Sequence, residues 1–161
     1  MITGIVSEQE YVAAHSLHRR PVAVAVNGFM VALLAIGLVL AAIGVGMLSY
    51  VLIFGGIGGL LGEAAQARLY LPAKVRKLYA QFKGVDAPTT YTWDDSTLEV
   101  KSERGAGRRN WTDLHKVGES GELILLYTTD HLFEIVPKRW FADTAQMTEF
   151  IRLAKRERSA T

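Results

Sequence analysis

The side chains best suited to chemistry in this sequence are few. His15 and His18 stand one helical turn apart and could share a metal ion, and His115 lies beside Asp113. A metal site needs further carboxylate, histidine or cysteine ligands at matching spacing, and none accompanies the two N-terminal histidines. We therefore interpret these histidines as polar residues of an interfacial helix. We expect no bound metal and no other cofactor.

The rest of the sequence gives little support for catalysis. The 161-residue chain contains no cysteine, which excludes disulfides, thiolate metal sites and cysteine nucleophiles. A serine, lysine or histidine nucleophile needs a base and an orienting partner, and no motif supplies them. No glycine-rich phosphate loop is present, because the densest glycines stand in an apolar run without a lysine. The net charge of +2 is too small to indicate nucleic acid as a partner. We expect a protein that is not an enzyme.

The strongest pattern in the chain is the run Pro21–Gly62, which contains no charged residue and no histidine. As one helix it would be about 63 Å long, twice the thickness of a hydrocarbon core of roughly 30 Å. We predict two transmembrane helices, Val22–Ala42 and Met47–Gly62. They would be joined by a tight turn at residues 43–46, where glycines permit unusual backbone angles. A buried hairpin in a soluble protein is the alternative, which we disfavour because soluble helices normally keep a polar face.

Glycines recur four residues apart in the second predicted span. Gly55 and Gly59 form one such pair, and Gly58 and Gly62 form another. In lipid, small residues at this spacing let helix backbones approach closely. We favour packing between the two spans of one chain, with a homodimer face as the alternative.

The charges that flank the apolar run predict its orientation. Arg19 and Arg20 precede the first span, several bases follow the second, and the connecting turn has none. The positive-inside rule then places both termini in the cytoplasm. We expect a multi-pass membrane protein.

The segment before the first span, residues 1–20, carries a helix-start signature. Ser7 can cap the first turn while Glu10 reaches back to the cap amide. The helix should end near Arg20, because Pro21 follows it. The first six residues would add a strand to the domain that follows the membrane hairpin.

The segment after the second span, residues 63–83, has the apolar spacing of an amphipathic helix, broken or restarted at Pro72. Such a helix can lie on an anionic leaflet or pack on the domain that follows, and the sequence favours neither. Its basic side chains, together with a second group near the C-terminal end, are candidates for binding lipid phosphate or a protein partner. The alternative is that they form solvated, charged helix faces. These candidates are Lys74, Arg76, Lys77, Lys138, Arg139, Arg152, Lys155 and Arg156.

The final segment, residues 84–161, is predicted to form a small domain of antiparallel strands closed by a helix. Turn-forming residues separate short runs with strand periodicity, and a helix capped by Asp143 or Thr144 follows. Strands followed by one helix indicate an α+β domain in which the helix plugs an open sheet. The expected strands are 89–93, 98–102, 108–114, 122–127 and 131–136, with turns at 94–96 and 105–107.

Part of this domain resembles a known family. Trp111, Asp113 and Glu119, an apolar strand, and then IVPKRWF at residues 135–141 resemble the YcxB-like proteins of bacterial membranes. The resemblance implies a protein of the bacterial cytoplasmic (inner) membrane. It also implies a short N-terminal segment, a two-span hairpin and a C-terminal domain similar to a pleckstrin-homology fold. It implies no settled biochemical activity.

For the motif residues themselves we expect structural roles. Trp111 would be a core anchor whose indole N–H needs one partner. Asp113 would accept hydrogen bonds from backbone amides of the turn that follows it. Phe141 would pack beneath the closing helix. The motif residues are Trp111, Asp113, Glu119, Pro137, Lys138 and Phe141.

These observations favour a membrane-tethered, non-catalytic interaction or regulatory protein. It would present its C-terminal domain at the cytoplasmic face to an unidentified protein partner. The alternatives are an anionic-lipid-binding domain and a bacterial immunity or protective membrane protein. The partners expected are the lipid bilayer, a protein, and a second copy of the chain if the glycine-rich span forms a dimer.

Overall fold

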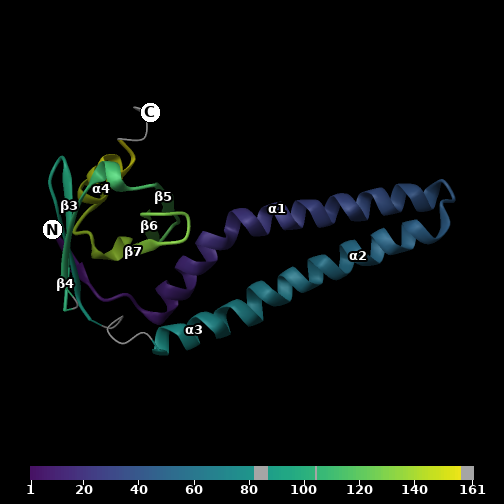
Figure 1. Cartoon of the computed structure of the whole chain (residues 1–161), viewed down its shortest axis with the longest axis horizontal. Coiled ribbons are helices and arrows are strands. Elements are labelled where there is room, and N and C mark those ends of the chain that lie inside the picture. The colour runs from purple at the N-terminus through teal and green to yellow at the C-terminus, as the bar shows by residue number, and fades with distance from the viewer. Residues whose placement is uncertain (82–86, 104, 157–161) are drawn as a thin grey trace. The chain divides into compact units, whose positions relative to one another are not determined.

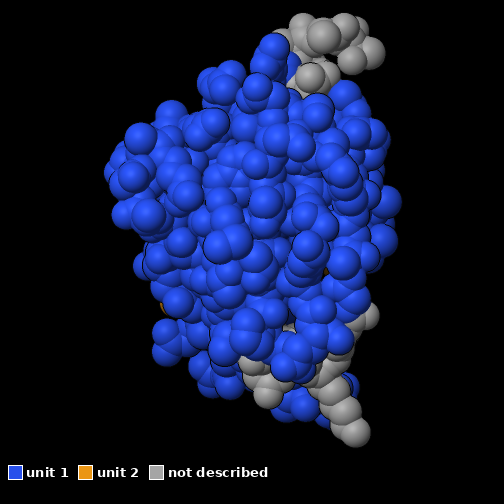
Figure 2. Space-filling view, turned by 90° about the vertical axis from the view of Figure 1, so that its left-hand side faces the viewer, with its two compact units in different colours: residues 1–17, 76–161 blue, residues 18–75 orange. Residues whose placement is uncertain are grey.

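The computed structural model describes residues 1–81, 87–103 and 105–156, which form long helices and two antiparallel sheets, an α+β fold (Figure 1). Residues 84–86, the start of the predicted C-terminal domain, lie outside this range. The chain divides into two compact units. Unit 1 combines Met1–Leu17 with Arg76–Thr161 (Figure 2, blue), and unit 2 is His18–Val75.

Unit 2 is a helical hairpin made from most of α1 (Glu8–Ala42) and from α2 (Gly46–Ala65). Both helices are long and apolar enough to cross a membrane, by length and composition. The predicted turn between them is confirmed. Gly44 adopts a φ of +77°, a conformation that other residues resist.

The prediction that the first helix ends near Arg20 is wrong, because α1 continues through Pro21 to Ala42. Proline removes its own N–H from the helical ladder and its ring crowds the carbonyl four residues earlier, but the helix persists here because the bonds on either side hold. The donor that Pro21 lacks would have reached the carbonyl of Leu17. The division between the two units falls directly after that residue.

The second proline is accommodated differently. Between α2 and α3 (Leu71–Gln81) lies a π-helical segment, η1 (Gln66–Tyr70), in which the Leu71 amide donates to the Gln66 carbonyl. Pro72 follows this segment directly, as the second residue of α3. The expected break at Pro72 is not seen, because the chain remains helical on both sides of the proline and only the type of helix changes.

Glycines allow close contact between the two helices of the hairpin. A Cβ on Gly37 would lie 2.9 Å from the Ile53 backbone nitrogen, and one on Gly56 would lie 3.0 Å from the Met30 carbonyl oxygen. Gly59 lies against the Met30 side chain. The three other glycines of the predicted packing pattern, Gly55, Gly58 and Gly62, would have nothing within 4 Å of an added Cβ. On α2, the close contacts therefore involve Gly59 from that pattern and Gly56, which the pattern omitted.

Unit 1 contains two sheets and a closing helix. The first sheet has the order β1-β2-β3-β4 and the second has the order β5-β6-β7, with all neighbours antiparallel. The N-terminal strand, predicted from the first six residues, is confirmed, since Ile2 pairs with Tyr91. The elements are β1 (Ile2–Gly4), β2 (Thr89–Trp93), β3 (Thr97–Ser102), β4 (Gly105–Asn110), β5 (Lys116–Glu119), β6 (Leu123–Tyr127), β7 (Phe133–Pro137) and α4 (Thr144–Arg156).

Strand β6 is central to the core because both of its faces are covered, as its unbroken apolar sequence predicted. Ile124 and Leu126 face the main core, where Phe150 of α4 is also fully buried. The alternate residues of β6 pack in a second cluster with Ala14 and Leu17, from the start of α1. The N-terminal segment therefore completes the domain from both ends, through β1 and through α1.

Two local predictions are wrong, and one strand was not predicted. The expected turn at residues 105–107 belongs to β4, because Gly105 pairs with Ser102 and Gly107 pairs with Val100. The end of the expected third strand is a short 3₁₀ helix, η2 (Trp111–Asp113). Strand β5 was not predicted, because Gly118 at its centre interrupts the alternation that marks a strand.

Candidate functional site

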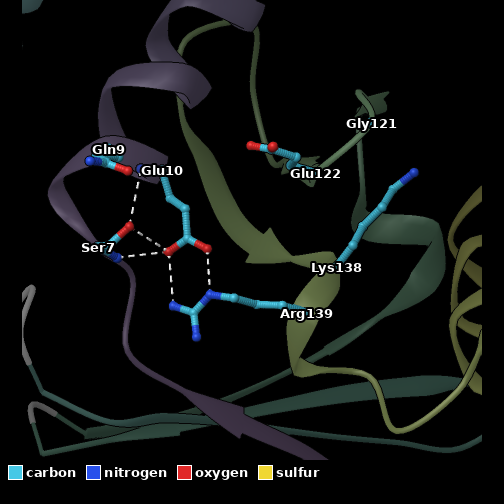
Figure 3. A pocket seen from close by; sticks show the side chains of 7 residues that line it. All are labelled: Ser7, Gln9, Glu10, Gly121, Glu122, Lys138 and Arg139. Atoms are coloured by element: carbon cyan, nitrogen blue, oxygen red, sulfur yellow. Dashed lines mark hydrogen bonds and ion pairs between the residues drawn. The ribbon is translucent and has the colours of Figure 1, made fainter.

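A polar pocket of about 500 Å³ lies within unit 1 (Figure 3). Three segments build it: the start of α1, the β5–β6 turn, and the 3₁₀ helix η3 (Lys138–Trp140). Two acidic and two basic side chains line it, so the charges of the lining balance. We call it the polar pocket, and its lining residues are Ser7, Gln9, Glu10, Gly121, Glu122, Lys138 and Arg139.

Glu10 joins the helix start to the basic motif segment. Its amide donates to Ser7 Oγ at 3.2 Å, and Ser7 N donates back to Glu10 Oε2 at 2.8 Å, which is the predicted capping box. The same carboxylate accepts from Arg139 Nε at 2.7 Å and from Nη2 at 3.0 Å (Figure 3). This two-point pairing is the strong form of an ion pair, and it raises the pKa of Arg139.

Arg139 also holds the chain between β1 and α1. Its Nη2 donates to the Ile5 carbonyl at 2.8 Å, and the Tyr79 hydroxyl donates to the Val6 carbonyl at 3.0 Å. These carbonyls belong to a stretch without regular structure, whose polar groups need other partners. Arg139, a candidate for lipid or partner binding, therefore also stabilises the fold of unit 1.

Glu119 and Lys138, two of the motif residues, meet in space. Lys138 Nζ donates to one oxygen of Glu119 at 2.8 Å, and Lys155 Nζ of α4 donates to the other at 2.9 Å. The hydrogen bond from Lys138, followed by that from Lys155, lowers the pKa of Glu119. One carboxylate thus holds two of the basic side chains that the sequence offered as candidates for phosphate binding.

The other candidate bases do not join this site. Arg76 pairs with Glu8 at 3.1 Å, with half or more of both side chains exposed, so the pair contributes little to stability. Lys74 lies over the ring of Tyr70, 5.9 Å from its centre. The remaining candidates are exposed at separate places on helices α3 and α4, and they are Lys77, Arg152 and Arg156.

The aromatic motif residues lie in the core. Trp111 is 3% exposed, its indole N–H donates to the Asp94 carbonyl at 2.9 Å, and its ring meets the edge of Phe150. Phe141 also contacts Phe150, with ring centres 5.3 Å apart. Asp113 accepts from the amide of Asn110, which precedes it, at 2.9 Å. The expectation that Asp113 binds the following turn is therefore wrong, because its carboxylate closes the capping box of η2.

The histidines have local partners. His15 Nδ1 lies 2.9 Å from the Tyr11 carbonyl oxygen. His115 Nε2 lies 3.1 Å from Asp130 Oδ1. Asp113 accepts from the Asn110 amide instead, so His115 and Asp113 are not partners. In the part of the chain that the structure describes, no three histidine or carboxylate side chains are grouped to hold a metal ion.

A second, smaller cavity of about 190 Å³ lies beside β2 and β7. Tyr91, Glu134 and Trp140 contribute to its lining. Burial, and then the nearby Glu134 carboxylate, raise the pKa of Tyr91, and Glu134 also pairs with Arg109. This group could not be predicted from the sequence, because Arg109 and Glu134 meet only in the folded chain.

Comparison with known proteins agrees with the motif. Residues 93–154 match the family model described as YcxB-like protein, which confirms the resemblance found in the sequence. No curated protein and no solved structure matches the chain.

Proposed function

We propose that this chain, whose residues 93–154 carry the YcxB-like family signature, is a non-catalytic interaction protein. Its helical hairpin tethers it in a membrane, and unit 1 binds a protein partner. The proposal has three parts: membrane insertion, the kind of domain displayed, and what that domain binds.

Membrane insertion is supported by the apolar surface of the hairpin. Phe29 and Leu38 of α1 and Phe54 and Leu61 of α2 are each more than half exposed. Water-soluble proteins rarely expose so continuous an apolar surface, whereas lipid would cover it. The bases flanking the hairpin favour both termini in the cytoplasm of a bacterial cell.

The displayed domain is proposed to be similar to a pleckstrin-homology fold. A four-stranded and a three-stranded antiparallel sheet, followed by one helix at the C-terminal end, support this assignment. Here the first strand, β1, precedes the hairpin in the chain, so the hairpin is inserted into the domain.

The pairing of the motif bases is the observation that carries the proposal of a protein partner. Arg139 is held by Glu10, and Lys138 and Lys155 are held by Glu119. A headgroup phosphate would have to compete with these carboxylates. A polypeptide surface with its own mixed polar groups can bind the polar pocket without breaking them. Lipid binding through this domain is accordingly less favoured, and the protective-protein alternative stays a prediction.

A second copy of the chain is a further candidate partner for the hairpin. Gly55, Gly58 and Gly62 have open space where a Cβ would stand, so this side of α2 could approach another helix closely.

Site-specific photo-crosslinking in native membranes tests the proposed partner. Gln9 lines the polar pocket and is exposed, so the photo-reactive residue p-benzoylphenylalanine can replace it. Thr112, exposed on η2 and outside the pocket lining, is the matched control position. We expect a protein adduct from position 9 that is absent from position 112. Adducts with phospholipid alone, or identical protein adducts at both positions, would contradict the proposal.

A further inference from the structure

Two polar atoms are buried without a partner beside the smaller cavity of unit 1. They are the indole nitrogen Nε1 of Trp140, which donates, and the carboxylate oxygen Oε2 of Glu134, which accepts. Both residues line this cavity of about 190 Å³. Within the part of the chain that the structure describes, neither atom has a hydrogen-bond partner. Buried polar atoms are nearly always paired, so an unpaired donor and an unpaired acceptor at one cavity indicate a ligand that serves both.

The fold holds these two side chains in place. The other oxygen of Glu134, Oε1, pairs with Arg109 of β4. The indole of Trp140 lies against Gly4 of β1, where an added Cβ would overlap Nε1. Trp140 is only 9% exposed, and its ring centre lies 6.2 Å from that of Tyr91. Neither side chain is therefore free to turn its unpaired atom toward water.

The lining of the cavity favours an aromatic ligand over water. Water occupies about 30 Å³ per molecule in the liquid, so the cavity could hold several. Most of its walls are apolar or aromatic, however, and such walls offer water few hydrogen bonds. An apolar cavity of about 150 Å³ is already large enough for a benzene ring. The apolar and aromatic side chains of the lining are Val6, Tyr11, Tyr91, Phe133, Ile135 and Trp140.

We propose that this cavity binds a phenol, either as a free small molecule or as the side chain of a tyrosine on another chain. A phenol is uncharged near neutral pH, and its hydroxyl both donates and accepts a hydrogen bond. It would donate to Glu134 Oε2 and accept from Trp140 Nε1, while the ring packs among the aromatic side chains. Because Arg109 already neutralises Glu134, the site suits an uncharged ligand.

Entry of the phenol requires a local adjustment of the cavity. Both polar atoms are covered, so the ring has to shift neighbouring side chains of the lining to reach them. The cavity shares no lining residue with the polar pocket. The phenol site therefore depends neither on the protein partner proposed above nor on membrane insertion.

Fluorine NMR of the full-length protein in detergent micelles tests this site. The chain has three tryptophans, so replacing them with 5-fluorotryptophan gives three signals, and Trp140→Phe identifies that of Trp140. The probe is p-cresol, which is the tyrosine side chain as a free molecule. The matched control ligand is 4-methylanisole, which keeps the ring and the oxygen but cannot donate a hydrogen bond.

We expect p-cresol to shift the Trp140 signal in a saturable way and to leave those of Trp93 and Trp111, which do not line the cavity, in place. 4-Methylanisole should bind about tenfold more weakly, because it cannot donate to the Glu134 carboxylate. No shift at Trp140, equal affinity for the two ligands, or parallel shifts of all three signals would overturn the proposal.

A pair of variants tests the role of the carboxylate. Glu134→Leu should bind the two ligands equally, whereas Glu122→Leu, at an exposed position outside this cavity, should keep the preference for p-cresol. An undiminished preference in Glu134→Leu would contradict the assigned role of Glu134. Titration with N-acetyltyrosine amide then separates the two sources, since its binding indicates a tyrosine of another chain and its exclusion indicates a free phenol.

Discussion

Phe150→Ala is expected to lower the free energy of unfolding of unit 1 by about 3–5 kcal/mol. Phe150 is fully buried, and its ring meets Trp93, Trp111 and Phe141 with centres 4.9 to 5.4 Å apart. Truncation removes these contacts and leaves a cavity next to Trp111 of η2 and Trp93 of β2. The loss is a large part of the stability of a small domain.

Tryptophan fluorescence during urea titration measures this effect. The chain has three tryptophans, and all lie in unit 1, so the signal reports the domain without interference from the hairpin. Glu149→Ala is the matched control, because Glu149 precedes Phe150 on α4 and is exposed. The control should shift the transition by no more than about 0.5 kcal/mol. Similar losses in both variants would show that α4 does not pack through Phe150.

Gly56→Ala and Gly37→Ala are expected to weaken the hairpin by about 1–3 kcal/mol each, which is the usual cost of overpacking. In both cases the added Cβ would meet backbone atoms of the facing helix at 2.9 to 3.0 Å, which can yield only if the helices separate. Two spin labels on cysteines introduced at Val24 and Leu61 would report that separation during titration with a denaturing detergent. Both positions are exposed, and the natural chain has no cysteine of its own.

Gly58→Ala provides the opposite expectation on the same helix. Nothing lies within 4 Å of the added Cβ, and alanine is a better helix former than glycine by about 1 kcal/mol. This variant should hold the hairpin together as well as the natural chain or better. If Gly56→Ala and Gly58→Ala open the hairpin equally, the close packing described for α1 and α2 is wrong.

Local signals in the sequence predicted much of the fold. Ser7 and Glu10 marked the start of α1, Gly44 marked the turn of the hairpin, and the unbroken apolar run of β6 indicated a strand covered on both faces. Each of these features is decided within a few residues. Composition and periodicity are sufficient for them.

The errors arose where the neighbours of one residue outweigh its own preference, or where distant residues meet. Pro21 looked like a boundary, yet the helical bonds on either side carry α1 through it. Gly105 looked like a turn, yet its pairing with Ser102 makes it the first residue of β4. The sequence showed Lys138 and Arg139 as two neighbouring bases. It could not show that Glu119 and Glu10 engage them, because those pairings join residues 19 and 129 positions apart.

Cysteine accessibility in intact cells tests the central claim most directly, namely that a membrane hairpin displays unit 1 in the cytoplasm. Met47→Cys places a thiol at the exposed start of α2, beside the hairpin turn, and Ala106→Cys places one on the exposed strand β4. A membrane-impermeant maleimide should label Met47→Cys in intact cells, and Ala106→Cys only after lysis. Labelling of Ala106→Cys in intact cells would contradict the account, since unit 1 would then face outward.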